Sequence, residues 1–143
     1  MYCTSQDLAD RFGADELIQL TAESDGFGNF PDEINQIQVD RAIADATATI
    51  DSYLAARYPL PLAQVPPVLE RYACDMTRYF LHDRSPLEEV TNRYKDAIRY
   101  LEKVAKGDIS LGIDSQGQRP ETMDGAEMQS GGSVFSRDDK SFI

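Results

Sequence analysis

The chain has no tryptophan, a single histidine and only two cysteines, and this scarcity excludes most metal and redox sites. Cys3 and Cys74 lack the CxxC spacing of structural zinc sites, and His82 alone cannot complete a ligand set without carboxylates. In a cytoplasm both thiols are expected to stay reduced. Cys74 falls on the apolar side of a predicted helix, so we interpret it as a small core residue.

Long apolar runs are also missing. No stretch of about 18 apolar residues occurs, so we expect no membrane-spanning helix. The N-terminal residues carry neither the charged nor the apolar region of a secretory signal, which predicts a protein made and kept in a cytoplasm.

Basic residues are few: 14 Lys and Arg stand against 25 Asp and Glu, giving a net charge of −11. Proteins that grip phosphate backbones need clustered cations, so this balance argues against specific nucleic-acid binding. A surface that DNA passes without sticking would fit the charge, but so would any soluble acidic protein.

Catalytic motifs are absent as well. The chain has no Gly-rich phosphate loop, no G-x-S-x-G and no H-E-x-x-H, and His82 lies at a predicted helix end. With Gly26 at the sixth position of a calcium loop, Thr21 and Asp32 would replace the usual Asp and Glu, and Pro31 would interrupt the exit. We therefore predict no catalytic, cofactor or metal site. A metal-assisted hydrolase that uses His82 and the acidic loop 23–33 is a distant alternative.

The chain does show helical periodicity. Apolar residues recur at steps of three and four along most of residues 1–107. Thr4 is a candidate N-cap with Asp7 three residues later, and Gly13 and Gly107 are candidate helix stops. We predict an all-α bundle of about five helices, at residues 4–13, 15–21, 32–57, from 65–67 to 82–83, and 85–107, the last with Ser85 as N-cap.

Between the third and fourth helices the sequence reads DSYLAARYPLPL, residues 51–62. Pro59 and Pro61 remove two backbone donors and favour extended geometry at Tyr58 and Leu60. We interpret this corner mainly as an intramolecular elbow, with a partner-facing apolar surface as the alternative.

After Gly107 the composition changes to Gly, Ser, Gln and Asp, which divides the chain into a helical core, 1–107, and a long, mostly irregular C-terminal arm, 108–143. The alternation over 109–113 predicts a possible short strand. The arm ends in VFSRDDKSFI, and apolar anchors after a polar spacer suggest a segment that orders on a partner. The predicted partner-binding residues are Ile109, Leu111, Ile113, Val134, Phe135, Arg137, Phe142 and Ile143.

Several segments resemble a known family. The opening MYCTSQDLADRFG is typical of the neck proteins of Mu-like phages and prophages. The ending VFSRDDKSFI is similar to a VFSRD-x-L-x-x-F pattern of these proteins, although Asp139 to Ser141 depart from it. Further similar segments lie at 16–21, 40–62, 65–79, 93–107 and 110–112.

The resemblance implies a head–tail adaptor, also called a head completion or connector protein, without enzymatic activity. Such proteins form a ring, here expected to be a dodecamer, under the portal protein in the neck of the virion. They extend the DNA channel, which DNA crosses without specific binding, and dock a downstream neck or tail protein. The C-terminal arm is expected to reach the portal or a neighbouring copy. The alternative is a small acidic helical module that captures a single soluble phage or host protein through its arm.

Overall fold

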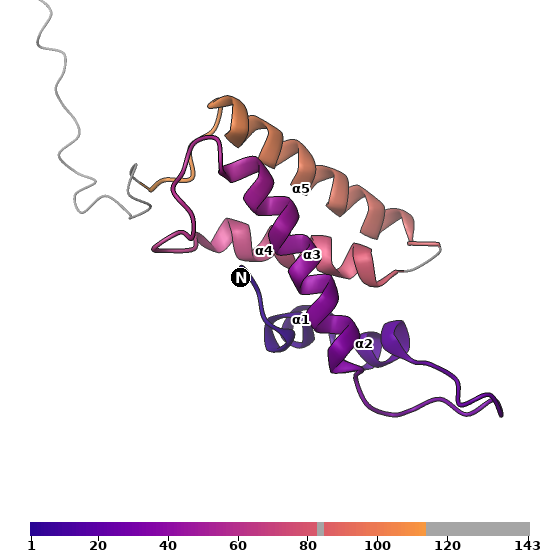
Figure 1. The fold of residues 1–143 in the computed structure, drawn as a ribbon. Helices are drawn as coiled ribbons and strands as arrows, with labels where there is room; N and C mark the ends of the chain where they lie inside the picture. The colour runs from indigo at the N-terminus through magenta and orange to yellow at the C-terminus, as the bar shows by residue number, and fades with distance from the viewer. Residues whose placement is uncertain (83–84, 114–143) are drawn as a thin grey trace, which may run out of the picture.

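The computed structural model describes residues 1–82 and 85–113, and these residues form five helices and no strand. The predicted all-α class is confirmed. Helices α3, α4 and α5 pack against one another, and α1 and α2 lie across one end of this layer (Figure 1). The helices are α1 (Ser5–Phe12), α2 (Ala14–Thr21), α3 (Gln36–Leu54), α4 (Pro67–Leu81) and α5 (Glu88–Lys106).

The start of α1 is fixed by a capping box, as predicted. The Thr4 side chain accepts a hydrogen bond from the Asp7 backbone N–H, and the Asp7 carboxylate accepts one from the Thr4 N–H. Gly13 then ends the helix with a positive φ of 90° and passes the chain directly to α2. Local chemistry alone thus sets both ends of this helix.

Helix α3 begins four residues later than the predicted start at Asp32. The Asn35 side chain caps it by accepting the Gln38 backbone N–H, and the Asn35 N–H donates to the hydroxyl of Thr21. Thr21 is buried at the end of α2, so a contact distant in sequence pins this start. The helix also ends earlier than predicted, at Leu54 instead of Arg57, and a turn follows.

The predicted N-cap at Ser85 is wrong. Helix α5 starts at Glu88, because Leu87 has an extended backbone (φ −62°, ψ 154°) and no side chain caps the helix. Glu88 and Glu89 in the first turn instead suit the positive end of the helix dipole. At the other end the prediction is confirmed: Gly107 is left-handed, and its N–H reaches the carbonyls of Lys103 and Val104.

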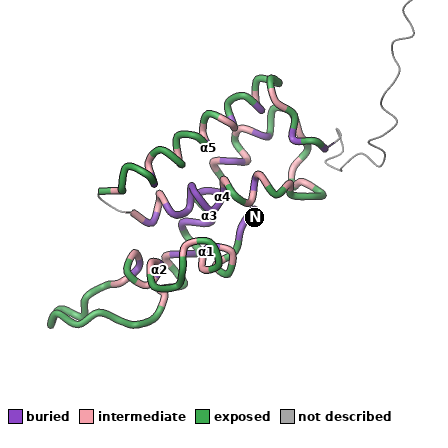
Figure 2. Tube along the Cα trace, turned by 180° about the vertical axis from the view of Figure 1, so that it is seen from behind, coloured by how far each residue is buried: buried purple, intermediate pink, exposed green. Residues whose placement is uncertain are grey.

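The core is apolar and lies where the helices face one another (Figure 2). Both cysteines belong to it, as predicted for Cys74. The largest fully buried side chains include Leu8, Leu17, Ile43, Ile50, Leu54, Leu69, Met76 and Leu101. In the described part of the chain, no helix combines the length and apolar character that crossing a membrane requires.

One buried cation ties the helices together. The guanidinium of Arg78 on α4 donates to both carboxylate oxygens of Glu16 on α2, at 2.7 and 2.9 Å, and lies 3.4 Å from Glu89 on α5. It also stacks on the ring of Phe12, 4.5 Å from the centroid. Such paired, bidentate contacts make a buried Arg tolerable and fix the helix arrangement.

Candidate protein interaction surfaces

The elbow between α3 and α4 packs on its own chain. Tyr58, Leu60 and Leu62 are half-buried against the core, and the hydroxyl of Tyr58 accepts the backbone N–H of Leu111 at 3.1 Å. These contacts support the interpretation of the segment as an intramolecular elbow over the alternative of an apolar surface that faces a partner.

The short strand considered for 109–113 is wrong. After Gly107 the chain turns back, with the N–H groups of Asp108 and Ile109 reaching the Lys103 carbonyl at 2.9 and 3.4 Å. Leu111 and Ile113 are 7% and 9% exposed, and Ile109 is half-buried against the core. These apolar residues alternate because they pack on the helices, not because they pair with another strand.

Of the eight predicted partner-binding residues, only Ile109, Leu111 and Ile113 fall among the described residues. The other five lie outside them: Val134, Phe135, Arg137, Phe142 and Ile143. For both groups a contact with a partner stays a prediction.

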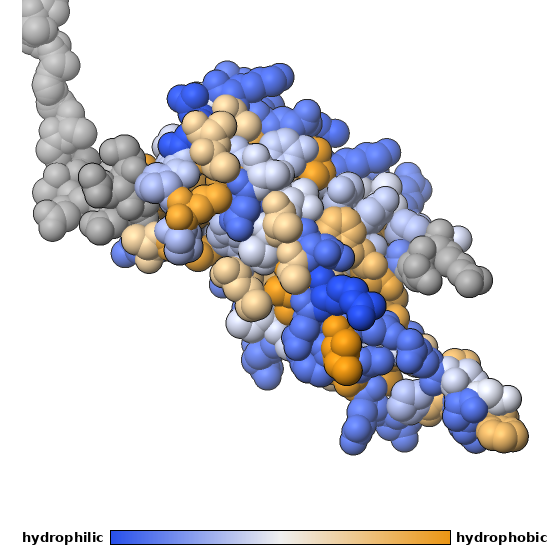
Figure 3. Space-filling view, in the orientation of Figure 1, coloured by the Kyte–Doolittle hydropathy of each residue, from blue (hydrophilic) through white to orange (hydrophobic). Residues whose placement is uncertain are grey.

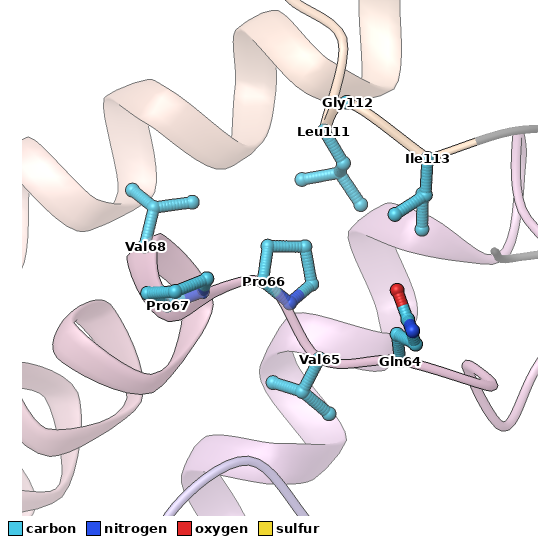
Figure 4. Close-up of a pocket in the computed structure, with 8 residues that line it drawn as sticks. All are labelled: Gln64, Val65, Pro66, Pro67, Val68, Leu111, Gly112 and Ile113. Atoms are coloured by element: carbon cyan, nitrogen blue, oxygen red, sulfur yellow. The ribbon is translucent and has the colours of Figure 1, made fainter. Parts of the chain in front are cut away.

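Leu111 and Ile113 form one wall of a hollow that we call the elbow pocket. Its other wall is the backbone stretch 64–68, which leads into α4, and its volume is about 620 Å³. Figure 4 shows Leu111 pointing across it toward Pro66, and Ile113 pointing toward the side on which Gln64 lies. Most of the residues that line the hollow are apolar, and Val65 on its rim is 39% exposed.

Three cations lie at the same end of the molecule as the elbow pocket. Arg57, Lys103 and Lys106 are exposed, and none forms an ion pair with another described residue. The Arg57 guanidinium lies against Gly107, where an added Cβ would come within 2.6 Å of it. This places Arg57 beside the last turn of α5, which carries both lysines.

The opposite end of the molecule is the loop 22–35 between α2 and α3, which extends well beyond the helices (Figures 1 and 2). Asp25 organises it: its carboxylate accepts the backbone N–H groups of Phe27 and Asn29 and the side-chain amide of Asn29. These bonds hold the pKa of Asp25 below its usual range. The loop is thus a defined turn even though it packs on little.

The aromatic character of this loop was not predicted from the sequence, where the segment was identified only as an acidic loop. Phe27 is 89% exposed and Phe30 is 63% exposed, and Ile37 in the first turn of α3 is 72% exposed. Figure 3 shows apolar surface at the tip of the loop. Two phenylalanines among glycines and carboxylates, remote from any helical stripe, were the available signal.

His82 and the two cysteines, which were considered for metal or catalytic chemistry, make contacts within the fold. His82 lies within 2.8 Å of the Arg78 carbonyl, and since a carbonyl only accepts, its Nδ1 donates. Within the described ranges, no group of three or more His, Cys, Asp or Glu side chains is placed to hold a metal ion. The hydrogen bond with Cys3 and burial raise the pKa of the Cys74 thiol, which keeps it protonated.

Comparison with known proteins gives concordant matches. The family described as "Bacteriophage Mu, Gp36" matches residues 2–130. The chain is 47% identical over 111 residues to the Mu-like prophage FluMu protein gp36 of Haemophilus influenzae, covering 77% of this chain and 79% of that protein. It is 38% identical over 143 residues to gene product J of Escherichia phage Mu, covering 99% of each. These matches confirm the resemblance to proteins of Mu-like phages and prophages, and the chain belongs to the Bacteriophage Mu Gp36 family.

Proposed function

We propose that this protein is a structural component of the phage neck, a head–tail adaptor that assembles as a ring on the portal protein. The supporting observation is the separation of two interaction surfaces to opposite ends of one helical body. One end presents exposed Phe27 and Phe30, and the other presents the elbow pocket, whose lining includes Ile113, the last residue that the structure describes. A protein that joins neighbours and extends a channel needs surfaces on more than one side.

The helical body between these two ends is suited to hold them in a fixed position relative to each other. The bidentate Arg78–Glu16 pair joins α4 to α2, and the Tyr58–Leu111 hydrogen bond ties the elbow to the segment after α5. Packed helices with such cross-links behave as one rigid unit, so a contact at one end constrains the geometry at the other. A subunit of a closed ring requires this constancy.

The C-terminal residues complete the proposal. Val134, Phe135, Arg137, Phe142 and Ile143 would bind the portal or a neighbouring copy, because four of them are apolar and the group follows a polar spacer about 20 residues long. The net charge of −11 would let DNA cross the ring without being held. The remaining face of the ring would dock the next neck or tail protein.

Co-sedimentation with assembled portal rings of the same phage tests the proposal. The full chain is compared with a truncation after Ile113, which keeps Leu111 and Ile113 against the core. We expect the full chain to sediment in amounts equimolar with portal subunits, and the truncation to lose binding.

Two other outcomes would carry different conclusions. Binding by both proteins would place the portal contact on the helical body instead of the C-terminal residues. Binding by neither would contradict the adaptor role and favour capture of a single soluble partner.

A further inference from the structure

The two ends of the molecule are complementary in shape and polarity. The loop 22–35 is a protrusion that ends in exposed aromatic rings, and the elbow pocket is an apolar hollow of about 620 Å³. An exposed phenylalanine such as Phe27, 89% exposed, gains free energy by entering an apolar cavity. The fold keeps the protrusion and the hollow of one copy far apart, so they can meet only between copies (Figure 1).

The ends are also complementary in charge. The loop carries Glu23, Asp25, Asp32 and Glu33 and no cation, a net charge of −4. At the elbow end, over residues 55–68 and 102–113, three cations face two carboxylates, a net charge of +1. Because the whole chain has a net charge of −11, this slightly positive end is a favourable surface for binding the acidic loop.

Charge also decides between the two ways in which copies of one chain can pair. A symmetric contact of loop with loop would bring four carboxylates against four others, and like charges in an interface cost affinity. A head-to-tail contact sets the acidic loop against Arg57, Lys103 and Lys106. Head-to-tail contacts produce rings when the rotation between copies closes.

We propose that copies of this chain associate head to tail, with Phe27 of one copy entering the elbow pocket of the next and Asp32 and Glu33 facing the cations Arg57, Lys103 and Lys106 at the same end. This inference deepens the proposed ring and rests on it for closure. The contact is small, so free copies would associate weakly and a template would strengthen it.

Disulfide trapping between two full-length variants tests the contact directly. One variant carries Phe27→Cys, and the other, enlarged by a tag, carries Val65→Cys on the rim of the pocket. The native Cys3 and Cys74 are buried and do not compete. The control partner carries Ala48→Cys, at an exposed position within α3.

After mild oxidation of the mixture, we expect the Phe27→Cys and Val65→Cys chains to cross-link several-fold more than Phe27→Cys with Ala48→Cys. Equal yields would overturn the proposal. A predominance of Phe27→Cys homodimers would show the symmetric contact instead. Protection of Val65→Cys from a thiol reagent in the monomer would show that residues of the same chain fill the pocket.

Charge reversal supplies an independent measurement on the same cross-linking pair. Asp32→Lys with Glu33→Lys on the loop should lower the yield about three- to tenfold, as should Arg57→Glu with Lys103→Glu at the elbow end. Combining the two reversals should restore the yield, because the charges are again opposite. A combined set no better than either alone would overturn the electrostatic part of the contact.

The portal assay separates this inference from the proposed function. If portal rings bind the chain but the cross-link shows no preference, the head-to-tail contact is wrong and the adaptor role stands. If the preferred cross-link forms but portal rings bind nothing, the contact is real and the adaptor role is wrong.

Discussion

Arg78 and Glu16, 62 residues apart in the chain, meet through two hydrogen bonds of 2.7 and 2.9 Å between guanidinium and carboxylate. The Arg78 side chain is 10% exposed and that of Glu16 is 29% exposed, so the pair is largely withdrawn from water. This contact and the Phe12 ring beneath the guanidinium set the position of the N-terminal helices on α4.

Removing this cation should therefore be costly. We expect Arg78→Ala to lower the free energy of unfolding by about 2–4 kcal/mol, because it strands a partly buried carboxylate and removes packing from Phe12. Urea denaturation followed by circular dichroism measures the change. Arg99→Ala, which breaks only the exposed pair with Asp96, should stay within about 0.5 kcal/mol of the parent. Similar losses in both variants would contradict a special role for Arg78.

Sequence alone predicted most of the helices because their signals are local. The α1 capping box and the Gly107 stop depend on residues within one turn, and both were correct. The start of α3 was predicted too early, because the Asn35 N–H is held by Thr21, which no local pattern reveals.

The interaction surfaces were only partly predictable, again for a physical reason. The apolar alternation at 109–113 fits a strand and a segment packed on helices equally well, and only the three-dimensional packing, which includes the Tyr58–Leu111 contact, separates the two. Phe27 and Phe30 lack periodicity, so their exposure depends on how the loop leaves the bundle. The elbow pocket is built from two segments far apart in sequence and could not be foreseen.

Removing the Tyr58 hydroxyl should lower the stability of the fold, although Tyr58 lies in a turn. Tyr58→Phe keeps the ring against the core but leaves the Leu111 N–H without its acceptor. We expect a loss of about 0.5–1.5 kcal/mol in unfolding free energy and faster amide exchange at Leu111. Tyr53→Phe on α3 serves as the control, because its ring is also half-buried while its hydroxyl makes no hydrogen bond with another described residue. Unchanged exchange at Leu111 would refute the contact.

Asp75 should make stability depend on pH. Burial raises the pKa of this carboxyl above its usual value, and the charge of Arg93 offsets only part of the effect. A raised pKa means that the folded state holds the proton more tightly than the unfolded chain, so this group lowers stability as pH rises through that window. Asp75→Asn should consequently raise Tm at pH 7, and the gain should shrink in acid, where Asp75 is protonated in both states. A gain that does not change with pH would contradict this account. The exposed Asp96→Asn is the control.

The thiols offer a test of how tightly the N-terminus is packed. Cys3 and Cys74 are 3% and 0% exposed, and Cys3 also contacts the Thr77 hydroxyl at 3.7 Å. Only the thiolate reacts readily with alkylating reagents, and the raised pKa of Cys74 suppresses that form. We expect native protein to be alkylated at Cys74 only at the rate of unfolding, measured by mass spectrometry across a urea series.

Thr77→Val, which removes the hydroxyl but preserves shape, should leave Cys74 protected. Leu8→Ala should speed its alkylation, because the cavity loosens α1 and favours opening. Rapid alkylation of Cys74 in the parent protein would show that the N-terminal segment detaches from α4 without global unfolding.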